Sequence, residues 1–160
     1  MAECKNIMVY VETAEGNPVK VGLEMLSPAK KLADKVTAVV IGGGVADAAK
    51  EVAKAGADQV ICVDSEDYKE FNLDAYAQVL VELVKEENPE AVFVGGTQDG
   101  KDIAPVVAAK CNTGCASDVL DIKAEDGEVI YTCPLYGGTV LEDVKIKTTP
   151  QIATLRSGAF

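Results

Sequence analysis

Residues 91–102, AVFVGGTQDGKD, pass from a short apolar run into glycines and then into residues typical of a helix start. The run predicts a buried strand, and the glycines predict a tight turn after it. From Gly95 to Lys101 the spacing fits the phosphate-binding pattern G-x-x-x-x-G-K, but Asp102 stands where that loop carries Ser or Thr for magnesium. We therefore expect a strand, a glycine turn and a helix N-terminus here, rather than a phosphate loop.

The same alternation of apolar run and amphipathic segment extends along the chain up to residue 110. Apolar, β-rich runs occur at 7–11, 37–41, 59–63 and 91–94, and helical spacing of apolar residues follows at 22–33, 45–53, 76–84 and 103–110. Pro28 either kinks the first helix or lies in the first turn of a second helix capped by Ser27, and Pro105 is expected close to the start of its helix. Such alternation is typical of a parallel sheet covered on both faces.

From Ala116 onward the pattern becomes that of antiparallel strands. Alternating or apolar runs at 119–123, 129–132 and 139–147 are separated by turn residues, including Glu125-Asp126-Gly127, and residues 152–155 are expected to form a last short strand. We therefore expect one α/β domain, residues 1–160, with a Rossmann-like, three-layer arrangement, a mainly parallel sheet and a C-terminal antiparallel β meander.

The composition excludes several classes of function. The formal net charge of −11 makes nucleic acid or an anionic membrane surface an unfavourable partner. The absence of histidine excludes His-based acid–base catalysis, His metal ligands and Ser-His or Cys-His nucleophile pairs. The segment Met1–Lys5 has neither the apolar core of a signal peptide nor the arginines of a transit peptide, and no run approaches transmembrane length. We expect a soluble, cytoplasmic protein without membrane insertion.

Five cysteines, an odd number, favour reduced thiols. Cys62 lies in an apolar run and is expected in the core. Cys111, Cys115 and Cys133 could form a metal or redox site, but zinc sites use shorter paired spacings, so we favour buried or idle thiols. The roles of these three residues stay open, and we expect no metal site and no catalytic residue.

Ligands of open α/β sheets bind at the carboxyl ends of the strands, so the loops after the first, second and fourth predicted strands are candidate sites. Gly42-Gly43-Gly44 fails the dinucleotide fingerprint G-x-G-x-x-G because Asp47 stands at its last position. In the meander, Pro134–Gly138 carries glycines that permit close backbone approach, and Tyr136 can present a ring to a planar ligand or partner. A hairpin corner explains that segment equally well.

Four stretches together resemble the alpha subunit of electron transfer flavoprotein, specifically its N-terminal domain. The stretches are GTQDGKDIAP (96–105), SDV (117–119), PLYGG (134–138) and PQIATLRSGAF (150–160). Their order and spacing also agree with that family, and the combination is far more specific than any one motif.

The resemblance implies an adenine nucleotide alpha hydrolase-like fold and a heterodimer with the electron transfer flavoprotein beta subunit. Such a heterodimer encloses flavin and carries electrons from acyl-CoA dehydrogenase or a similar flavoenzyme, so this chain is an electron carrier subunit rather than a stand-alone catalyst. In the family, FAD is held mainly by a C-terminal domain, which this sequence does not include, and by the partner subunit. The partner also holds AMP or, in electron-bifurcating members, a second FAD.

Several points stay open at this stage. The Gly137-Gly138 pair favours a bifurcating member, but the sequence does not identify the dehydrogenase. It also leaves open whether the chain is a fragment or a short natural protein.

In the family, the segments equivalent to Gly95–Asp102 and Pro134–Gly138 lie toward the flavin and the partner subunit. The cofactor-binding residues that the resemblance implies here are Gly95, Gly96, Thr97, Gln98, Lys101, Tyr136 and Gly137. Two positions depart from the family, which often carries arginine where this chain has Val106 and a basic residue where it has Cys133. The second departure argues against direct flavin contact at Cys133, because a cation there would stabilise a reduced, anionic flavin.

The alternative function is a free-standing adenine-nucleotide-binding regulatory module of the universal-stress-protein type, which shares the general fold. That class carries a G-x-x-G motif, whereas no two glycines of this chain lie three residues apart.

Overall fold

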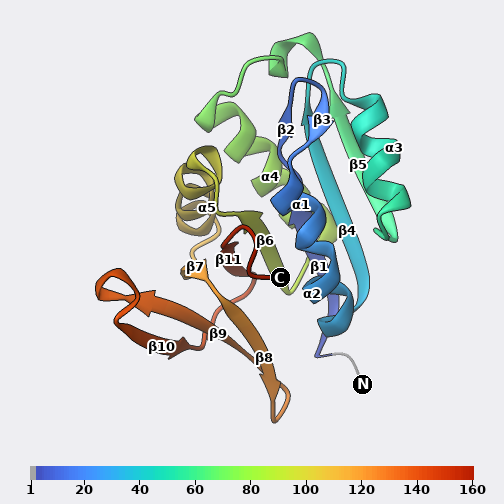
Figure 1. The fold of residues 1–160 in the computed structure, drawn as a ribbon. Helices are drawn as coiled ribbons and strands as arrows, with labels where there is room; N and C mark the ends of the chain where they lie inside the picture. Colours follow the sequence, from blue (N-terminus) through green and yellow to red (C-terminus); the bar gives the residue numbers. More distant parts are fainter. Residues whose placement is uncertain (1–2) are drawn as a thin grey trace.

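The computed structural model describes residues 3–160 and has three layers around a central sheet (Figure 1). The sheet has six strands in the order β5-β4-β1-β6-β11-β7, and every neighbouring pair is parallel. The strands are β1 (Cys4–Tyr10), β4 (Ala33–Gly42), β5 (Gln59–Asp64), β6 (Ala91–Gly95), β7 (Cys115–Val119) and β11 (Gln151–Leu155). The expected three-layer α/β fold with a mainly parallel sheet is confirmed.

Both faces of the sheet are buried, which explains the continuous apolar strands. Alternate residues of β1 enter two different cores: Ile7 and Val9 one, Met8 and Tyr10 the other. The first core lies under α1 (Lys20–Glu24), α2 (Leu26–Leu32) and α3 (Ala46–Lys54), and the second under α4 (Leu73–Glu87) and α5 (Gln98–Lys110). A short hairpin, β2 (Thr13–Ala14) with β3 (Asn17–Pro18), follows β1, and two short 3₁₀ turns complete the fold, Glu66–Tyr68 and Tyr136–Gly138.

A second sheet of three antiparallel strands projects from the body in Figure 1. Its strands are β8 (Asp121–Glu125), β9 (Glu128–Leu135) and β10 (Val140–Val144), with β9 in the middle. Tyr131 of β9 fastens this sheet to the central one, because its buried ring meets Phe93 of β6 edge-on at 6.4 Å between centroids. Its hydroxyl donates a hydrogen bond to Gln151 Oε1 at 2.9 Å. The small sheet is therefore part of the first core.

The meander prediction is correct for this antiparallel sheet, except at the start of its first predicted strand. The run 119–123 breaks at Leu120, so that β7 joins the central sheet and β8 the small one. The final strand, β11, inserts between β6 and β7 parallel to both. This position between two strands buries residues 152–155 on both faces, and even the polar Thr154 is only 2% exposed.

Three local predictions also differ from the structure. The first helical segment is broken at Met25, so Pro28 does lie in the first turn of a second helix, although Met25 rather than Ser27 occupies the N-cap position. Pro105 lies inside α5, well past its first turn, where the missing N–H leaves the Lys101 carbonyl without its helical partner. Cys62 is exposed because β5 is the edge strand.

The turn between β6 and α5 depends on close backbone approach. A Cβ atom on Gly100 would lie 1.8 Å from the Gly95 carbonyl oxygen, and one on Gly96 would lie 3.0 Å from the Leu155 carbonyl oxygen. The Gly96 N–H donates to that same Leu155 oxygen at 2.8 Å. The glycines of the opening stretch thus pack helix against sheet.

The substitution Gly100→Ala should lower the free energy of unfolding by at least about 2 kcal/mol, because the added methyl meets rigid backbone rather than a side chain that can move. Urea unfolding followed by circular dichroism measures this loss. Gly114→Ala is the matched control, since its Cβ would meet only Ile146 at an ordinary 3.5 Å. Equal stabilities of the two variants would contradict the packing role of Gly100.

Candidate functional site

The loops after β1, β4 and β6 meet at the carboxyl edge of the central sheet, as the sequence predicts. The sheet grows from β1 in two directions: β4 and β5 follow on one side, and β6 lies on the other. The strand order therefore reverses at β1. Open α/β sheets bind ligands at such a reversal of strand order. Two cavities lie along this edge, one on each side of the β1–β6 pair.

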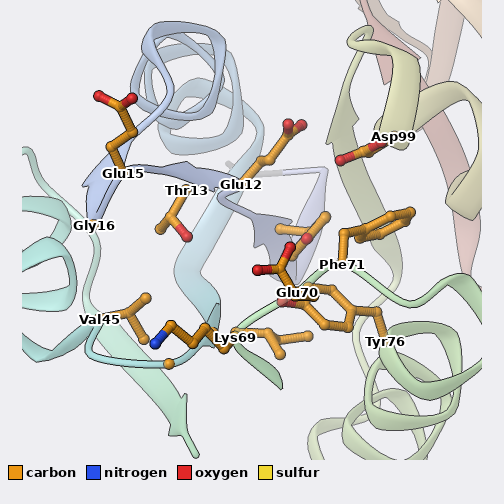
Figure 2. A pocket seen from close by; sticks show the side chains of 14 residues that line it. Glu12, Thr13, Glu15, Gly16, Val45, Lys69, Glu70, Phe71, Tyr76 and Asp99 are labelled. Atoms are coloured by element: carbon orange, nitrogen blue, oxygen red, sulfur yellow. The ribbon is translucent and has the colours of Figure 1, made fainter. Parts of the chain in front are cut away.

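The first cavity, which we call the strand-end cavity, has a volume of about 350 Å³ and lies beside the carboxyl ends of β1 and β4 (Figure 2). Its lining carries one basic residue, Lys69, and four carboxylates: Glu12, Glu15, Glu70 and Asp99. Figure 2 shows Asp99 reaching in from α5 on the side of the opening where Glu12 lies. The cavity is therefore acidic.

This acidic lining argues against a nucleotide phosphate in the strand-end cavity, because like charges would repel. In the glycine loop after β4, a backbone donor is already bonded within the protein, since the Gly44 N–H donates to the Asp64 carboxylate at 2.7 Å. In the loop after β6, the Gly100 N–H donates to Thr97 Oγ1 at 3.0 Å. Both loops satisfy backbone donors that phosphate-binding loops offer to a ligand, and the geometry thus weighs against the universal-stress-protein alternative.

Thr97 and Glu12 form a bond across the reversal point. The Thr97 hydroxyl donates to Glu12 Oε2 while accepting the Gly100 N–H as the N-cap of α5. Burial raises the pKa of Glu12 above its ordinary value and nearby Asp99 adds to the rise, whereas the bond from Thr97 opposes both. Glu12 is thus a partly buried carboxylate beside a second acid.

The second cavity, which we call the Lys101 cavity, has a volume of about 300 Å³ and lies near the ends of β6, β7 and β11. It is lined by Lys101, Ser117, Asp118 and Thr154. Among residues 3–160, Lys101 is in no ion pair, so its ammonium group is available at the cavity. This side of the edge offers a cation and two hydroxyls.

Asp118 lines the Lys101 cavity and is held in place by Arg156, which is not part of the lining. Asp118 has a left-handed backbone, with φ of 60°, and its N–H donates to Thr154 Oγ1 at 2.8 Å. The Arg156 guanidinium donates to both Asp118 oxygens, with Nε 2.9 Å from Oδ1. Hydrogen bonding to Arg156 lowers the pKa of the Asp118 carboxyl against the opposing effect of burial, and Lys101 adds to the lowering. Asp118 is thus neutralised by Arg156, which leaves Lys101 as the uncompensated charge.

The seven cofactor-binding residues that the resemblance implies fall into three places. Thr97 lies at the reversal point, and Gly95 and Gly96 pack the β6–α5 turn. Lys101 lines the second cavity and Gln98 is exposed on the first turn of α5. Tyr136 and Gly137 lie on the turn between β9 and β10, on the other sheet. Within the described chain, none of the seven lines the strand-end cavity.

Among residues 3–160, the exposed large apolar side chains lie on the turn between β9 and β10 and on the strand ends beside it. Tyr136 is 84% exposed, and both it and Gly137 have positive φ, 51° and 67°. On the adjoining strands, the cross-strand partners Leu135 and Val140 and the next residue, Leu141, are also exposed, and we call these three residues and Tyr136 the hairpin patch. Exposed apolar clusters on an otherwise polar surface mark interaction sites.

The remaining cysteines do not form a site that the structure supports. Burial raises the pKa of the Cys111, Cys115 and Cys133 thiols, which disfavours their reactive thiolates. Within residues 3–160 no three Cys, Asp or Glu side chains are grouped so as to hold a metal ion. The helices of this same part of the chain are too short or too polar to span a bilayer.

Sequence reasoning missed the residues of the strand-end cavity. Tyr10 lies in an apolar strand and looked like core, while Phe71 and Tyr76 come from a loop and a helix far along the chain. The one available signal was the placement of Glu12 and Asp99 directly after two predicted strands. Nothing in the spacing shows that β1 and β6 are neighbours.

Comparison with known proteins gives a consistent picture. The sequence model of the electron transfer flavoprotein domain matches residues 7–160. Protein FixB of Clostridium saccharobutylicum is 36% identical over 100% of this chain and 50% of its own length. The electron transfer flavoprotein subunit alpha of Clostridium acetobutylicum is 36% identical over 99% of this chain and 49% of its own length.

A third relative is the subunit LctC of lactate dehydrogenase (NAD(+),ferredoxin) from Acetobacterium woodii, at 32% identity over 98% of this chain and 39% of its own. The chain thus spans about half the length of the first two of these relatives. Because the domain model and these relatives align along nearly all of the sequence, the chain belongs to the electron transfer flavoprotein domain family.

Proposed function

We propose that this chain is the N-terminal domain of an electron transfer flavoprotein alpha subunit, which pairs with a beta subunit and helps enclose flavin. In this role it carries electrons from a flavoenzyme dehydrogenase and does not catalyse a reaction alone. The observation that carries the proposal is the alignment of almost the whole chain with about half of proteins named as that subunit. The family's cofactor is a flavin.

We infer that most contacts to FAD come from a C-terminal domain and from the beta subunit, with AMP a further ligand of that partner. The described chain fits this division, since its cavities of about 350 and 300 Å³ are small for a dinucleotide and the larger one is acidic. Bound flavin would supply the redox chemistry. This chain would supply surface, orientation and charge at the edge of the cofactor.

Lys101 is the residue best suited to that electrostatic role. Lys101 is in no ion pair in the described chain, and it lines the cavity together with Ser117 and Thr154. A cation without an ion-pair partner favours negative charge placed close to it. The anionic edge of a ligand would therefore be stabilised by lying in the Lys101 cavity, close to this ammonium group.

The hairpin patch fits the surface expected for a partner subunit. Leu141 is 59% exposed and Val140 47% exposed, on a strand that pairs only with β9 in the described chain. The core of a protein interface is typically formed by such aromatic and aliphatic side chains, with few charges. We infer that this patch contacts the beta subunit.

Replacement of Leu141 by Asp should weaken assembly with a beta subunit by about 2 kcal/mol or more, because a charge would be buried in the interface. Co-expression followed by size-exclusion chromatography and calorimetric titration measures the loss. Leu141→Met keeps the apolar surface and should assemble normally. If Leu141→Asp assembles as tightly as the parent, the patch is not the interface.

The substitution Lys101→Met should slow electron transfer in the assembled, flavin-containing complex by about tenfold, which corresponds to about 1.4 kcal/mol. Its melting temperature should change little, because Lys101 is exposed and unpaired in the described chain. Stopped-flow reduction of the bound flavin gives the rate. Lys110→Met, at the far end of α5, is the control, and equal rates for the two variants would refute a role for Lys101.

A further inference from the structure

The strand-end cavity has no part in the function proposed above, yet it is built around a buried tyrosine. Tyr10 is 2% exposed and lines this cavity, and among residues 3–160 nothing is hydrogen-bonded to its hydroxyl. Glu12, Tyr76 and Asp99 line the same cavity, and their charges add to the effect of burial in raising the pKa of Tyr10. No fully buried side-chain oxygen or nitrogen of the described residues lacks a hydrogen-bond partner, so the unbonded Tyr10 hydroxyl opens into the cavity, where it can bond a ligand.

The charges around Tyr10 define the sign of that ligand. Glu12, Glu70 and Asp99 line the cavity, and Figure 2 shows the Glu70 carboxylate turned toward its interior. The single basic residue, Lys69, is paired at 3.7 Å with Glu66, which is not part of the lining. The lining therefore repels anions and favours a cation.

A metal ion does not fit this arrangement. Within the described residues no three acidic side chains come close enough together to ligate one ion. The carboxylates are spread around a cavity of about 350 Å³, which suits a small organic molecule. A ligand that meets them must be extended and carry more than one positive group.

The rest of the lining is apolar and aromatic. Ile41 and Val45 contribute aliphatic surface, and the Phe71 and Tyr76 rings lie edge-on with centroids 5.0 Å apart. Methylene groups gain by contact with such surface, and aromatic faces attract ammonium groups. The lining thus combines carboxylates with apolar surface. A ligand in which methylene groups separate amines would match this combination.

We propose that the strand-end cavity binds a linear aliphatic diamine or polyamine. One ammonium group lies between Glu12 and Asp99 and is accepted by the Tyr10 hydroxyl oxygen, and a second meets Glu70. The methylene chain crosses Ile41 and Phe71. Nothing in this proposal depends on flavin or on the beta subunit, so its failure would leave the proposed function untouched.

Glu12 provides a readout that does not depend on added ligand. Its pKa is raised in the folded protein, mainly by burial and also by Asp99, so the folded state binds this proton more tightly than the unfolded state. At neutral pH the ionised carboxylate therefore costs stability. Glu12→Gln, which can still accept the Thr97 hydroxyl, should melt at a higher temperature at pH 7, and the gap should close as the pH falls toward 4.5 and Glu12 becomes protonated. A constant gap from pH 7 to pH 4 would contradict this account of Glu12.

Calorimetric titration of the purified protein with putrescine and spermidine, in buffer containing salt, tests the proposal. We expect saturable binding at one site, weakened about tenfold or more by Glu12→Gln and by Asp99→Asn, and about threefold by Tyr10→Phe. Glu51→Gln, an exposed acid on α3 outside the cavity, should bind like the parent. Saturating spermidine should also raise the melting temperature of the parent more than that of Glu12→Gln.

Three results would overturn the proposal. The first is the absence of saturable binding by either amine. The second is an equal effect of Glu51→Gln and Glu12→Gln, which would show only general attraction to a chain of net charge −11. The third is displacement of spermidine by AMP or by magnesium chloride at the same ionic strength, which would assign the cavity to another ligand.

Discussion

The Thr97 hydroxyl makes the contact on which the arrangement of the carboxyl edge depends. It accepts the Gly100 N–H at the start of α5 and donates to Glu12 beyond the end of β1. A single side chain thus links the start of α5 to the segment that follows β1, two parts of the chain that are distant in sequence. It can do so because Gly96 and Gly100 let the turn pack against backbone, while Gly95 leaves room for the Val21 side chain. This turn fixes where α5 begins, and with it the positions of Asp99 and Lys101 on the helix.

That turn separates two environments of opposite charge. On the side of β4, carboxylates surround an aromatic and aliphatic lining. On the side of β11, Arg156 neutralises Asp118 and leaves Lys101 without a partner in the described chain. Since electrostatic energy falls with distance and is strongest where water is excluded, each cavity selects ligands by sign. A chain with strong overall negative charge can in this way still offer one local site to an anion.

The sequence predicted the elements well where hydrophobic periodicity decides them, as at β1, β4 and α3. It failed where the outcome depends on which strands become neighbours. The last short strand could be expected from its apolar run, but its insertion between β6 and β7 depends on packing over the whole sheet. Pro105 was misplaced because the helix begins at Gln98, where Thr97 caps it, and not at its first apolar residue. Of the site, Lys101 could be named from a motif, whereas the cavity around Tyr10 could not, since its lining comes from four separate segments.

The attachment of the small sheet has a thermodynamic consequence for association. Tyr131 packs on Phe93 and bonds to Gln151, so the strand that leads to the hairpin patch is fixed by the main core before any partner arrives. A patch on a loose arm would lose conformational entropy on binding, at a cost of about 1–2 kcal/mol for each residue whose backbone becomes ordered. A patch on a strand that is already fixed does not lose this free energy when the complex forms. Its affinity for a partner is therefore determined in part by an aromatic contact that lies inside the domain and touches no partner.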